Sequence, residues 1–219
     1  MKKLLRKIKR FLDKILGTVV DQIYWRGYYV LVKEDIKENL SHPYKDIFLR
    51  EISRSAPFER VLEIGCGAGF NLYKLAKEFP DKKFYGVDIS SKAIGQGKKF
   101  LKKEGINDVF LEKTAAENLS IFAEKSMDTI FSYATIMYIG PDRIERAVRE
   151  MLRVAKKNII LCEYHAPTKP FYNDHWVYDY KELFKNYVEE KNMEIIELSK
   201  EKNKNDWAKF GHIIKIKLK

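Results

Sequence analysis

The stretch from Val61 to Asn71 constrains the fold of this chain more than any other. Its run VLEI, apolar except for Glu63, is followed directly by the loop GCGAG, and an amphipathic pattern containing Leu72, Leu75 and Ala76 follows at helical spacing. This order predicts a strand, a tight turn and a helix. Glycine at every second loop position permits positive φ angles and close approach of a ligand to the backbone. We therefore expect backbone N–H groups to face a ligand at the start of a helix.

A second apolar run, Lys83 to Val87, ends on Asp88, nineteen positions beyond Gly69. A carboxylate at the end of the second strand of a βαβ unit accepts hydrogen bonds from ribose hydroxyls. The glycine spacing is Gly-x-Gly-x-Gly, which differs from the Gly-x-Gly-x-x-Gly of dinucleotide-binding folds. Together the two features indicate a ligand with a ribose at the edge of a parallel sheet.

At these residues the chain resembles the class I S-adenosylmethionine-dependent methyltransferases, and among them the broad group that methylates small molecules. The phrase VLEIGCGAGFNL is similar to the family's first motif, and YGVDIS is similar to its acidic second-strand motif. The resemblance implies S-adenosylmethionine as cofactor and S-adenosylhomocysteine as product. It also implies a set of cofactor-binding residues: Glu63, Gly65, Cys66, Gly67, Gly69, Asp88, Ile89, Ala116, Glu117 and Ser132.

The segment after the predicted third strand departs from the family pattern. Ala115 stands where an acid that accepts the adenine amino group is usual. The adenine contact is then expected from the backbone or from a neighbour such as Glu117. Glu117 equally fits the first turn of a helix predicted over 117–124, where the helix dipole favours an acid. Asp128, at the start of the fourth strand, is expected to cap or pair.

Apolar patterns alternate between strand and helix from residue 59 onward. They predict strands near 60–64, 83–88, 107–112, 127–133, 158–164, 193–199 and 211–218, and helices near 70–79, 91–104, 117–124, 142–155 and 178–190. Such alternation predicts an α/β, Rossmann-like sheet of seven mostly parallel strands with helices on both faces. No helix is predicted between the last two strands, so they should pair antiparallel. We divide the chain into a helical extension or lid, 1–58, and a methyltransferase domain, 59–219.

The net charge of +11 is concentrated at the two ends of the chain. Residues 1–20 carry seven Lys or Arg and one Asp, residues 200–219 carry seven Lys and two acids, and the remaining stretch is balanced. An enzyme acting on nucleic acid more often spreads basic side chains over its catalytic face. Nucleic acid is therefore the less favoured partner, and a small-molecule acceptor is preferred.

Residues 1–20 place apolar and basic side chains at helical spacing, which predicts a basic amphipathic helix. The helix fits an anionic membrane surface, its own domain, or a second copy in a homodimer, and nucleic acid is a further alternative. No apolar run reaches the ~18 residues of a membrane span. Cys66 and Cys162 are expected to be free thiols in a reducing compartment, so we expect a cytoplasmic protein, either fully soluble or peripherally bound to a membrane.

Candidate groups for chemistry follow the later strands. The stretch from Ser132 to Tyr138 should face the reacting methyl, because ligands lie outside the carboxyl ends of parallel strands. His165 is the candidate base, since histidine accepts protons near neutral pH; it equally fits a histidine bonded within a loop. Glu163, His165 and His175 lack a diagnostic metal spacing, and no metal is predicted. The candidate substrate contacts, which include aromatics that fit a core equally well, are Tyr24, Tyr28, Tyr138, His165 and His175.

The preferred hypothesis is an S-adenosylmethionine-dependent methyltransferase of a small molecule or a lipid or glycan precursor. An RNA or protein methyltransferase that uses the basic termini is the first alternative. A non-catalytic binding subunit with a methyltransferase-like fold is the second, and the intact glycine motif argues against it.

Overall fold

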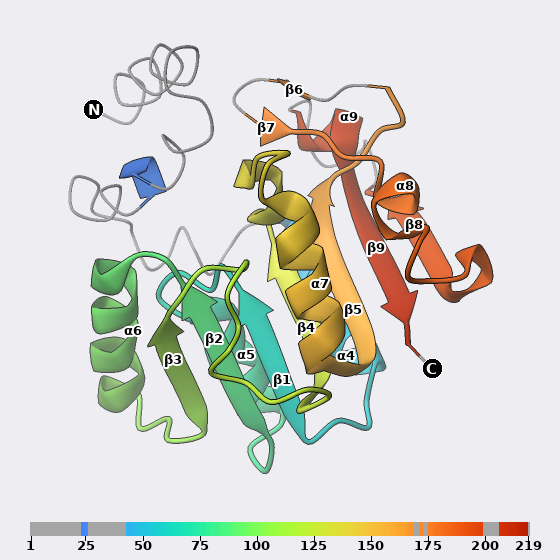
Figure 1. Cartoon of the computed structure of the whole chain (residues 1–219). Helices are drawn as coiled ribbons and strands as arrows, with labels where there is room; N and C mark the ends of the chain where they lie inside the picture. Colours follow the sequence, from blue (N-terminus) through green and yellow to red (C-terminus); the bar gives the residue numbers. More distant parts are fainter. Residues whose placement is uncertain (1–22, 26–42, 169–170, 173–174, 199–205, 219) are drawn as a thin grey trace.

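The computed structural model describes residues 23–25, 43–168, 171–172, 175–198 and 206–218. Within them a seven-stranded sheet has the order β3-β2-β1-β4-β5-β9-β8 (Figure 1). Its strands are β1 (Arg60–Ile64), β2 (Lys83–Asp88), β3 (Val109–Lys113), β4 (Met127–Tyr133), β5 (Ala155–Tyr164), β8 (Met193–Glu197) and β9 (Gly211–Lys217). The other elements are α4 (Pro43–Arg54), α5 (Phe70–Glu78), α6 (Ser91–Lys103), η1 (Ile136–Tyr138), α7 (Ile144–Val154), β6 (Phe171–Tyr172), β7 (His175–Trp176), α8 (Tyr180–Phe184), η2 (Glu190–Asn192) and α9 (Trp207–Phe210).

The strand directions confirm the predicted Rossmann-like sheet. Strands β1 to β5 pair in parallel, β9 is antiparallel to β5, and β8 is antiparallel to β9. In this register Ile64 lies between Val87 of β2 and Ser132 of β4, so the carboxyl ends of these three strands meet. The prediction that no helix lies between the last two strands is wrong, because the short helix α9 lies between β8 and β9. Their predicted antiparallel pairing is confirmed.

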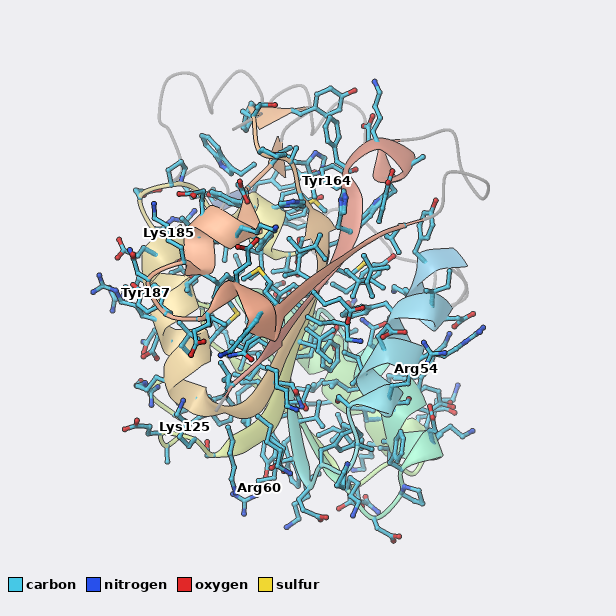
Figure 2. The ribbon with its side chains drawn as sticks, turned by 90° about the vertical axis from the view of Figure 1, so that its right-hand side faces the viewer. Arg54, Arg60, Lys125, Tyr164, Lys185 and Tyr187 are labelled. Atoms are coloured by element: carbon cyan, nitrogen blue, oxygen red, sulfur yellow. The ribbon has the colours of Figure 1, made fainter. Side chains whose placement is uncertain are left out.

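Helices cover both faces of the sheet because successive strand residues point to opposite sides. Val61 packs with α4, α5 and α6 in one apolar cluster, whereas Leu62 packs with α7 and α8 in the other. The view along the sheet shows α4, which ends at Arg54, on one side and α8, just before Lys185, on the other (Figure 2). Both faces are therefore buried, as the continuous apolar runs of the parallel strands require.

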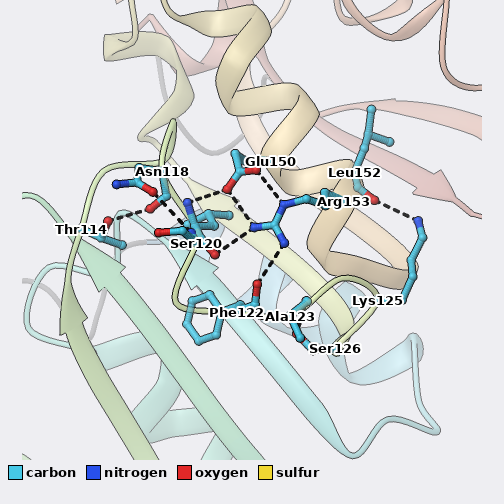
Figure 3. A network of polar contacts seen from close by, with 11 residues as sticks. Thr114, Asn118, Ser120, Phe122, Ala123, Lys125, Ser126, Glu150, Leu152 and Arg153 are labelled. Carbon is cyan, nitrogen blue, oxygen red and sulfur yellow. Dashed lines mark hydrogen bonds and ion pairs between the residues drawn. The ribbon is translucent and has the colours of Figure 1, made fainter.

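The helix predicted over 117–124 is absent from the structure, which has turns there. The Arg153 guanidinium donates hydrogen bonds to the carbonyl groups of Leu119 and Phe122, at 3.0 and 2.9 Å (Figure 3). The N–H of Leu119 donates to Glu150, at 2.7 Å. Two side chains of α7 thus take the backbone groups that a helix would pair internally, and tertiary contacts override the local pattern.

Two other predictions differ from the structure or lie beyond it. The helix predicted over 178–190 is shorter: α8 starts at the side-chain cap of Asp179 and ends at Phe184. The predicted helix 1–20 lies outside the described residues. Helix α4 lies inside the predicted extension 1–58 and packs on the sheet, where the rings of Phe48 and Phe131 are 5.9 Å apart. The division at residue 58 stays a prediction.

None of the helices in the described part of the chain has the length and hydropathy of a membrane span.

Candidate functional site

A cavity of about 380 Å³ opens beyond the carboxyl ends of β1, β2 and β4. This is the edge at which open α/β sheets bind ligands. Residues that the sequence analysis selected line much of it: Glu63, Gly65, Cys66, Gly67, Asp88, Ile89, Ala116, Glu117 and Tyr138. Trp25, next to the candidate Tyr24, also lines it. Others were missed: Lys45, Asn71, Arg143 and Trp207. Asn71 lies two residues beyond Gly69, whereas the other three come from helices and a turn that only tertiary packing brings to the sheet edge.

The loop between β1 and α5 requires its glycines. Gly65, Gly67 and Gly69 have φ angles of 71°, 55° and 76°, in the left-handed region that side chains disfavour. A Cβ at Gly65 would also lie 2.1 Å from Oγ1 of Thr135. The loop N–H groups of Gly65 and Cys66 donate to the carbonyl of Val87, which anchors the loop to β2. Gly69 holds the N-cap position of α5.

Asp88 fastens the same loop from the end of β2. Its carboxylate accepts hydrogen bonds from the N–H groups of Gly67, at 2.9 Å, and Ser90, at 2.8 Å. A carboxylate offers about four acceptor positions, so these bonds are compatible with further donors from a ribose. Asp88 therefore combines a structural role in the loop with a place on the cavity wall.

Glu63 is a buried acid, 1% exposed, on the cavity wall. Oε1 accepts a hydrogen bond from Asn71, at 2.6 Å, whereas Oε2 has no hydrogen-bond partner within the described part of the chain. Burial raises the pKa of Glu63 to about 8, against the opposing effects of the Asn71 hydrogen bond and the Lys45 charge. A ligand ammonium would satisfy the unbonded oxygen, so the site fits the amino group of S-adenosylmethionine.

The predicted adenine contacts also line the cavity. Ala116 and Glu117 line the cavity, and Glu117 forms an ion pair with Arg143, at 2.7 Å. Glu117 lies in a turn, so its interpretation as a helix-start residue is wrong. Asp128 pairs with Lys157, at 3.2 Å, and accepts hydrogen bonds from two backbone N–H groups, as predicted.

Ser132 and Glu163 are hydrogen-bonded to each other, and Glu163 binds the turn after β4. Ser132 is fully buried and donates to Oε1 of Glu163, at 2.8 Å, and it is not among the described residues that line the cavity. Glu163 also accepts from the N–H groups of Thr135, Ile136 and Met137, at 2.9, 3.0 and 3.3 Å. Burial raises the pKa of Glu163 to about 7, although these bonds favour the ionised form.

Tyr138, on the cavity wall, contacts His175, which is not among the described residues that line the cavity. The Tyr138 hydroxyl lies 3.0 Å from Nε2 of His175, and the Trp25 ring lies 4.6 Å from the Tyr138 ring. Tyr24 packs edge-on against Trp25, at 5.1 Å, and Tyr28 lies outside the described residues. The hairpin of β6 and β7, which carries His175, lies above the carboxyl ends of the parallel strands (Figure 1).

His165 lies elsewhere. Its Nδ1 is 3.2 Å from the Tyr178 carbonyl oxygen and 3.3 Å from the Tyr180 nitrogen, and its ring is 5.1 Å from that of His212. Burial and the neighbouring His212 lower the pKa of His165. It is not among the described residues that line the cavity, and its role as a base stays a prediction.

The two cysteines are free thiols, as predicted. Cys66 and Cys162 are both buried, and burial raises the pKa of each thiol. Among the described residues, no three His, Cys, Asp or Glu side chains gather in a way that would hold a metal ion.

Comparisons with known proteins agree with this geometry. Residues 61–158 match the family model of a methyltransferase domain. A tRNA (guanine-N(7)-)-methyltransferase of Christiangramia forsetii is 36% identical over 72 residues, which are 32% of each chain. O-methyltransferase 3 of Dictyostelium discoideum is 29% identical over 153 residues, which are 68% of this chain and 32% of the relative. The chain thus spans about a third of the length of these curated relatives.

A solved structure supplies the fold comparison. The crystal structure of an S-adenosylmethionine-dependent methyltransferase from Aquifex aeolicus superposes with a TM-score of 0.62 and 17% identity, covering 85% of this chain and all of the other. At this identity the likeness concerns the fold, and the family assignment depends on the domain match together with the glycine loop and Asp88. Residues 61–158 therefore form a methyltransferase domain, and the chain has the fold of the S-adenosylmethionine-dependent methyltransferases.

Proposed function

We propose that this protein transfers a methyl group from S-adenosylmethionine to a small-molecule acceptor. The observation that carries the proposal is a single cavity that combines the glycine loop, Asp88 and the unbonded oxygen of Glu63 with an aromatic upper wall. The glycine loop, Asp88 and Glu63 suit a nucleoside with an amino-acid tail. The aromatic wall suits an acceptor of limited size.

When bound, the cofactor supplies the reactive methyl group on its sulfonium. The protein residues bind and orient the two reactants. In this proposal Asp88 accepts from the ribose hydroxyls, Glu63 accepts from the amino group, and Ala116 and Glu117 contact the adenine. The glycine loop excludes water from one side, and Trp25, Tyr138 and Trp207 exclude it from the other. Orientation and water exclusion are the main contributions that a protein makes to such a displacement.

The aromatic wall supports a small acceptor. The rings of Tyr133 and Trp207 lie nearly parallel, 13° apart with centroids at 5.7 Å, and both residues line the cavity. Trp25 lines it from the N-terminal part of the chain. A wall built from two distant chain segments favours a compact apolar or planar molecule, or the reactive end of a lipid or glycan precursor.

An RNA or protein acceptor is the second candidate. It is supported by the net charge of +11 and by the similarity of this chain to four curated tRNA (guanine-N(7)-)-methyltransferases. Transfer of labelled methyl to bulk tRNA that falls steeply with salt would favour this candidate over a small molecule. Co-sedimentation with anionic vesicles, with and without residues 1–20, tests the peripheral membrane alternative.

Calorimetric titration with S-adenosylhomocysteine tests the cofactor site. We expect binding near micromolar for the wild type and a loss of about 100-fold or more for Asp88→Ala, since hydrogen bonds to a charged acceptor contribute about 1.5–3 kcal/mol each. Asp108→Ala is the matched control, because Asp108 is an exposed acid ahead of β3. NADH as competitor should not displace the ligand.

Absence of S-adenosylhomocysteine binding by folded, ligand-free wild type would refute the methyltransferase proposal and favour a non-catalytic role. Equal affinity of the Asp88→Ala and Asp108→Ala variants would refute the assignment of the ribose contact alone.

A further inference from the structure

We propose that Tyr138 and His175 form a proton relay that makes a hydroxyl group, carried on a planar apolar molecule, the methyl acceptor of this site. The inference depends on the proposed methyltransferase function and specifies the acceptor class. It names the atom that is methylated, which the proposed function leaves open.

The two side chains come from elements far apart in the chain. Tyr138 ends η1, the turn after β4, and lines the cavity. His175 begins β7, and its Nε2 lies 3.0 Å from the Tyr138 hydroxyl oxygen. That distance is a good hydrogen bond between a hydroxyl and a ring nitrogen. In the tautomer protonated at Nδ1, His175 accepts the Tyr138 proton at Nε2.

Aromatic rings enclose the pair. The Trp25 ring lies 4.6 Å from the Tyr138 ring, and the Tyr164 ring lies 5.1 Å from the His175 ring. Low local polarity strengthens a hydrogen bond between partners that remain in contact. The relay therefore leads from the cavity wall to an imidazole behind it, away from the glycine loop.

A hydroxyl acceptor needs such a relay and an uncharged amine does not. An alcohol or phenol is mostly protonated near neutral pH, and its oxygen becomes a strong nucleophile only as its proton leaves. An amine attacks with its lone pair and can release its proton afterwards. The presence of a proton path at the acceptor end therefore favours oxygen as the methylated atom.

Methyl transfer to the acceptor oxygen is coupled to two proton transfers. A bond forms between the acceptor oxygen and the methyl carbon while the bond between that carbon and the sulfonium breaks, and the electron pair returns to sulfur. The acceptor proton passes to the Tyr138 oxygen as the Tyr138 proton passes to Nε2 of His175. After the product leaves, the imidazolium returns the proton from Nε2 to the Tyr138 oxygen as Tyr138 releases its own proton to water in the cavity, which restores the pair.

The alternative bases fit less well. His165 holds its Nδ1 against backbone atoms of Tyr178 and Tyr180, and it is not among the described lining residues. Glu163 directs both oxygens to the turn after β4. Of the described lining residues, Tyr138 is the one whose hydroxyl is hydrogen-bonded to an imidazole.

Labelled S-adenosylmethionine with matched acceptors tests the relay. Hydroxyquinoline and aminoquinoline, and phenol and aniline, differ only in the acceptor atom. We expect label in the hydroxyl member of each pair. Tyr138→Phe and His175→Gln should lower that rate by about 100-fold or more, the usual effect of removing a general base. His212→Gln and Tyr73→Phe, which change a histidine and a tyrosine outside the cavity lining, are the matched controls.

A nitrophenol acceptor separates a relay from a structural role. It is ionised at the pH of the assay, so no proton has to leave, and His175→Gln should methylate it within about threefold of the wild-type rate. Affinity for S-adenosylhomocysteine, measured by calorimetry on every variant, should also stay within about threefold. A merely structural defect would lower the rates with phenol and nitrophenol equally.

Four results would overturn the proposal: label in the amino acceptors alone, no label in any hydroxyl acceptor, equal losses with phenol and nitrophenol, or a loss in His165→Gln that His175→Gln does not share. Each of them leaves S-adenosylhomocysteine binding intact. Failure of the underlying methyltransferase function would instead appear as absence of that binding in the wild type.

Discussion

Lys45 and Glu63 bring opposite charges to one cavity. Lys45 reaches it from α4 and is 9% exposed, with its Nζ 5.6 Å from the centre of the Tyr133 ring. Its charge lowers the pKa of Glu63, although burial raises that pKa more. An acid and a base side by side match the ammonium and carboxylate of a free amino acid. We therefore expect Lys45 to bind the carboxylate of the cofactor's amino-acid tail.

The Lys45→Met variant tests this expectation. A charged hydrogen bond contributes about 1.5–3 kcal/mol, so S-adenosylhomocysteine affinity should fall about 10- to 100-fold. Methylthioadenosine lacks the amino-acid tail, and its affinity should not change. Calorimetry with both ligands measures the difference, and Lys77→Met on α5 is the control for loss of a lysine. Equal losses for the two ligands would show that Lys45 acts on the fold of the site.

At the level of single residues, the sequence identified groups whose chemistry is local. Gly65 and Asp88 were identified because each lies in a short sequence motif, the glycine loop and the end of the second strand. In the structure the Gly67 N–H of that loop donates a hydrogen bond to Asp88. Lys45 was missed because no sequence motif marks it within the predicted extension 1–58. Its approach to Glu63 depends on how α4 packs across the sheet, which no local pattern encodes.

The end of β5 controls the turn after β4. Glu163 takes three successive N–H groups, and the strained Ala134, with φ of 53°, precedes them. Thr135 in that turn contacts the Gly65 carbonyl, with 3.4 Å between the oxygens. The buried carboxylate of Glu163 thus holds the turn that contacts the glycine loop through Thr135.

Replacing Glu163 with alanine should leave these N–H groups without partners. We expect a loss of roughly 2–4 kcal/mol in the free energy of unfolding, because each buried unsatisfied group costs about 1–3 kcal/mol and removal of a buried carboxylate offsets part of that. Urea denaturation measures the loss. Hydrogen exchange should show faster exchange at the amides of residues 135–137. Glu197→Ala, an exposed acid on β8, is the control, and unchanged protection at those amides would contradict the assigned role.

The regular elements were predictable where one periodicity dominates. The strands near 60–64, 83–88 and 127–133 match β1, β2 and β4 because apolar runs bounded by turns have few alternatives. The helix predicted over 117–124 failed because Arg153 and Glu150, far along the chain, bind its backbone. The sequence of residues 117–124 alone does not show that side chains of α7 compete for their backbone hydrogen bonds.

For the molecule as a whole, buried acids couple stability to pH. Burial raises the pKa of Glu63 from an ordinary 4.5 to about 8, so the folded state holds a proton that the unfolded chain has already released. Stability from this group is fully present below about pH 4.5 and is lost as pH rises towards 8. Glu163, with a pKa of about 7, adds a loss of the same sign.

Glu63→Gln should therefore be less sensitive to pH than the wild type. The amide keeps an acceptor for Asn71 and carries no charge, so its free energy of unfolding should fall less between pH 5.5 and 8.5, by a few kcal/mol. Urea denaturation at several pH values measures both slopes. Glu112→Gln, on the exposed side of β3, should follow the wild type. Identical slopes for wild type and Glu63→Gln would contradict the raised pKa.

The insertion of β9 between β5 and the edge strand β8 has a consequence for biosynthesis. Trp207 leads into β9, and its ring closes the cavity against Tyr133. A nascent chain that has emerged only as far as β8 already holds the glycine loop and Asp88, yet it lacks one wall and the strand next to β5. We therefore expect cofactor capture only after the chain through Lys217 has emerged and folded.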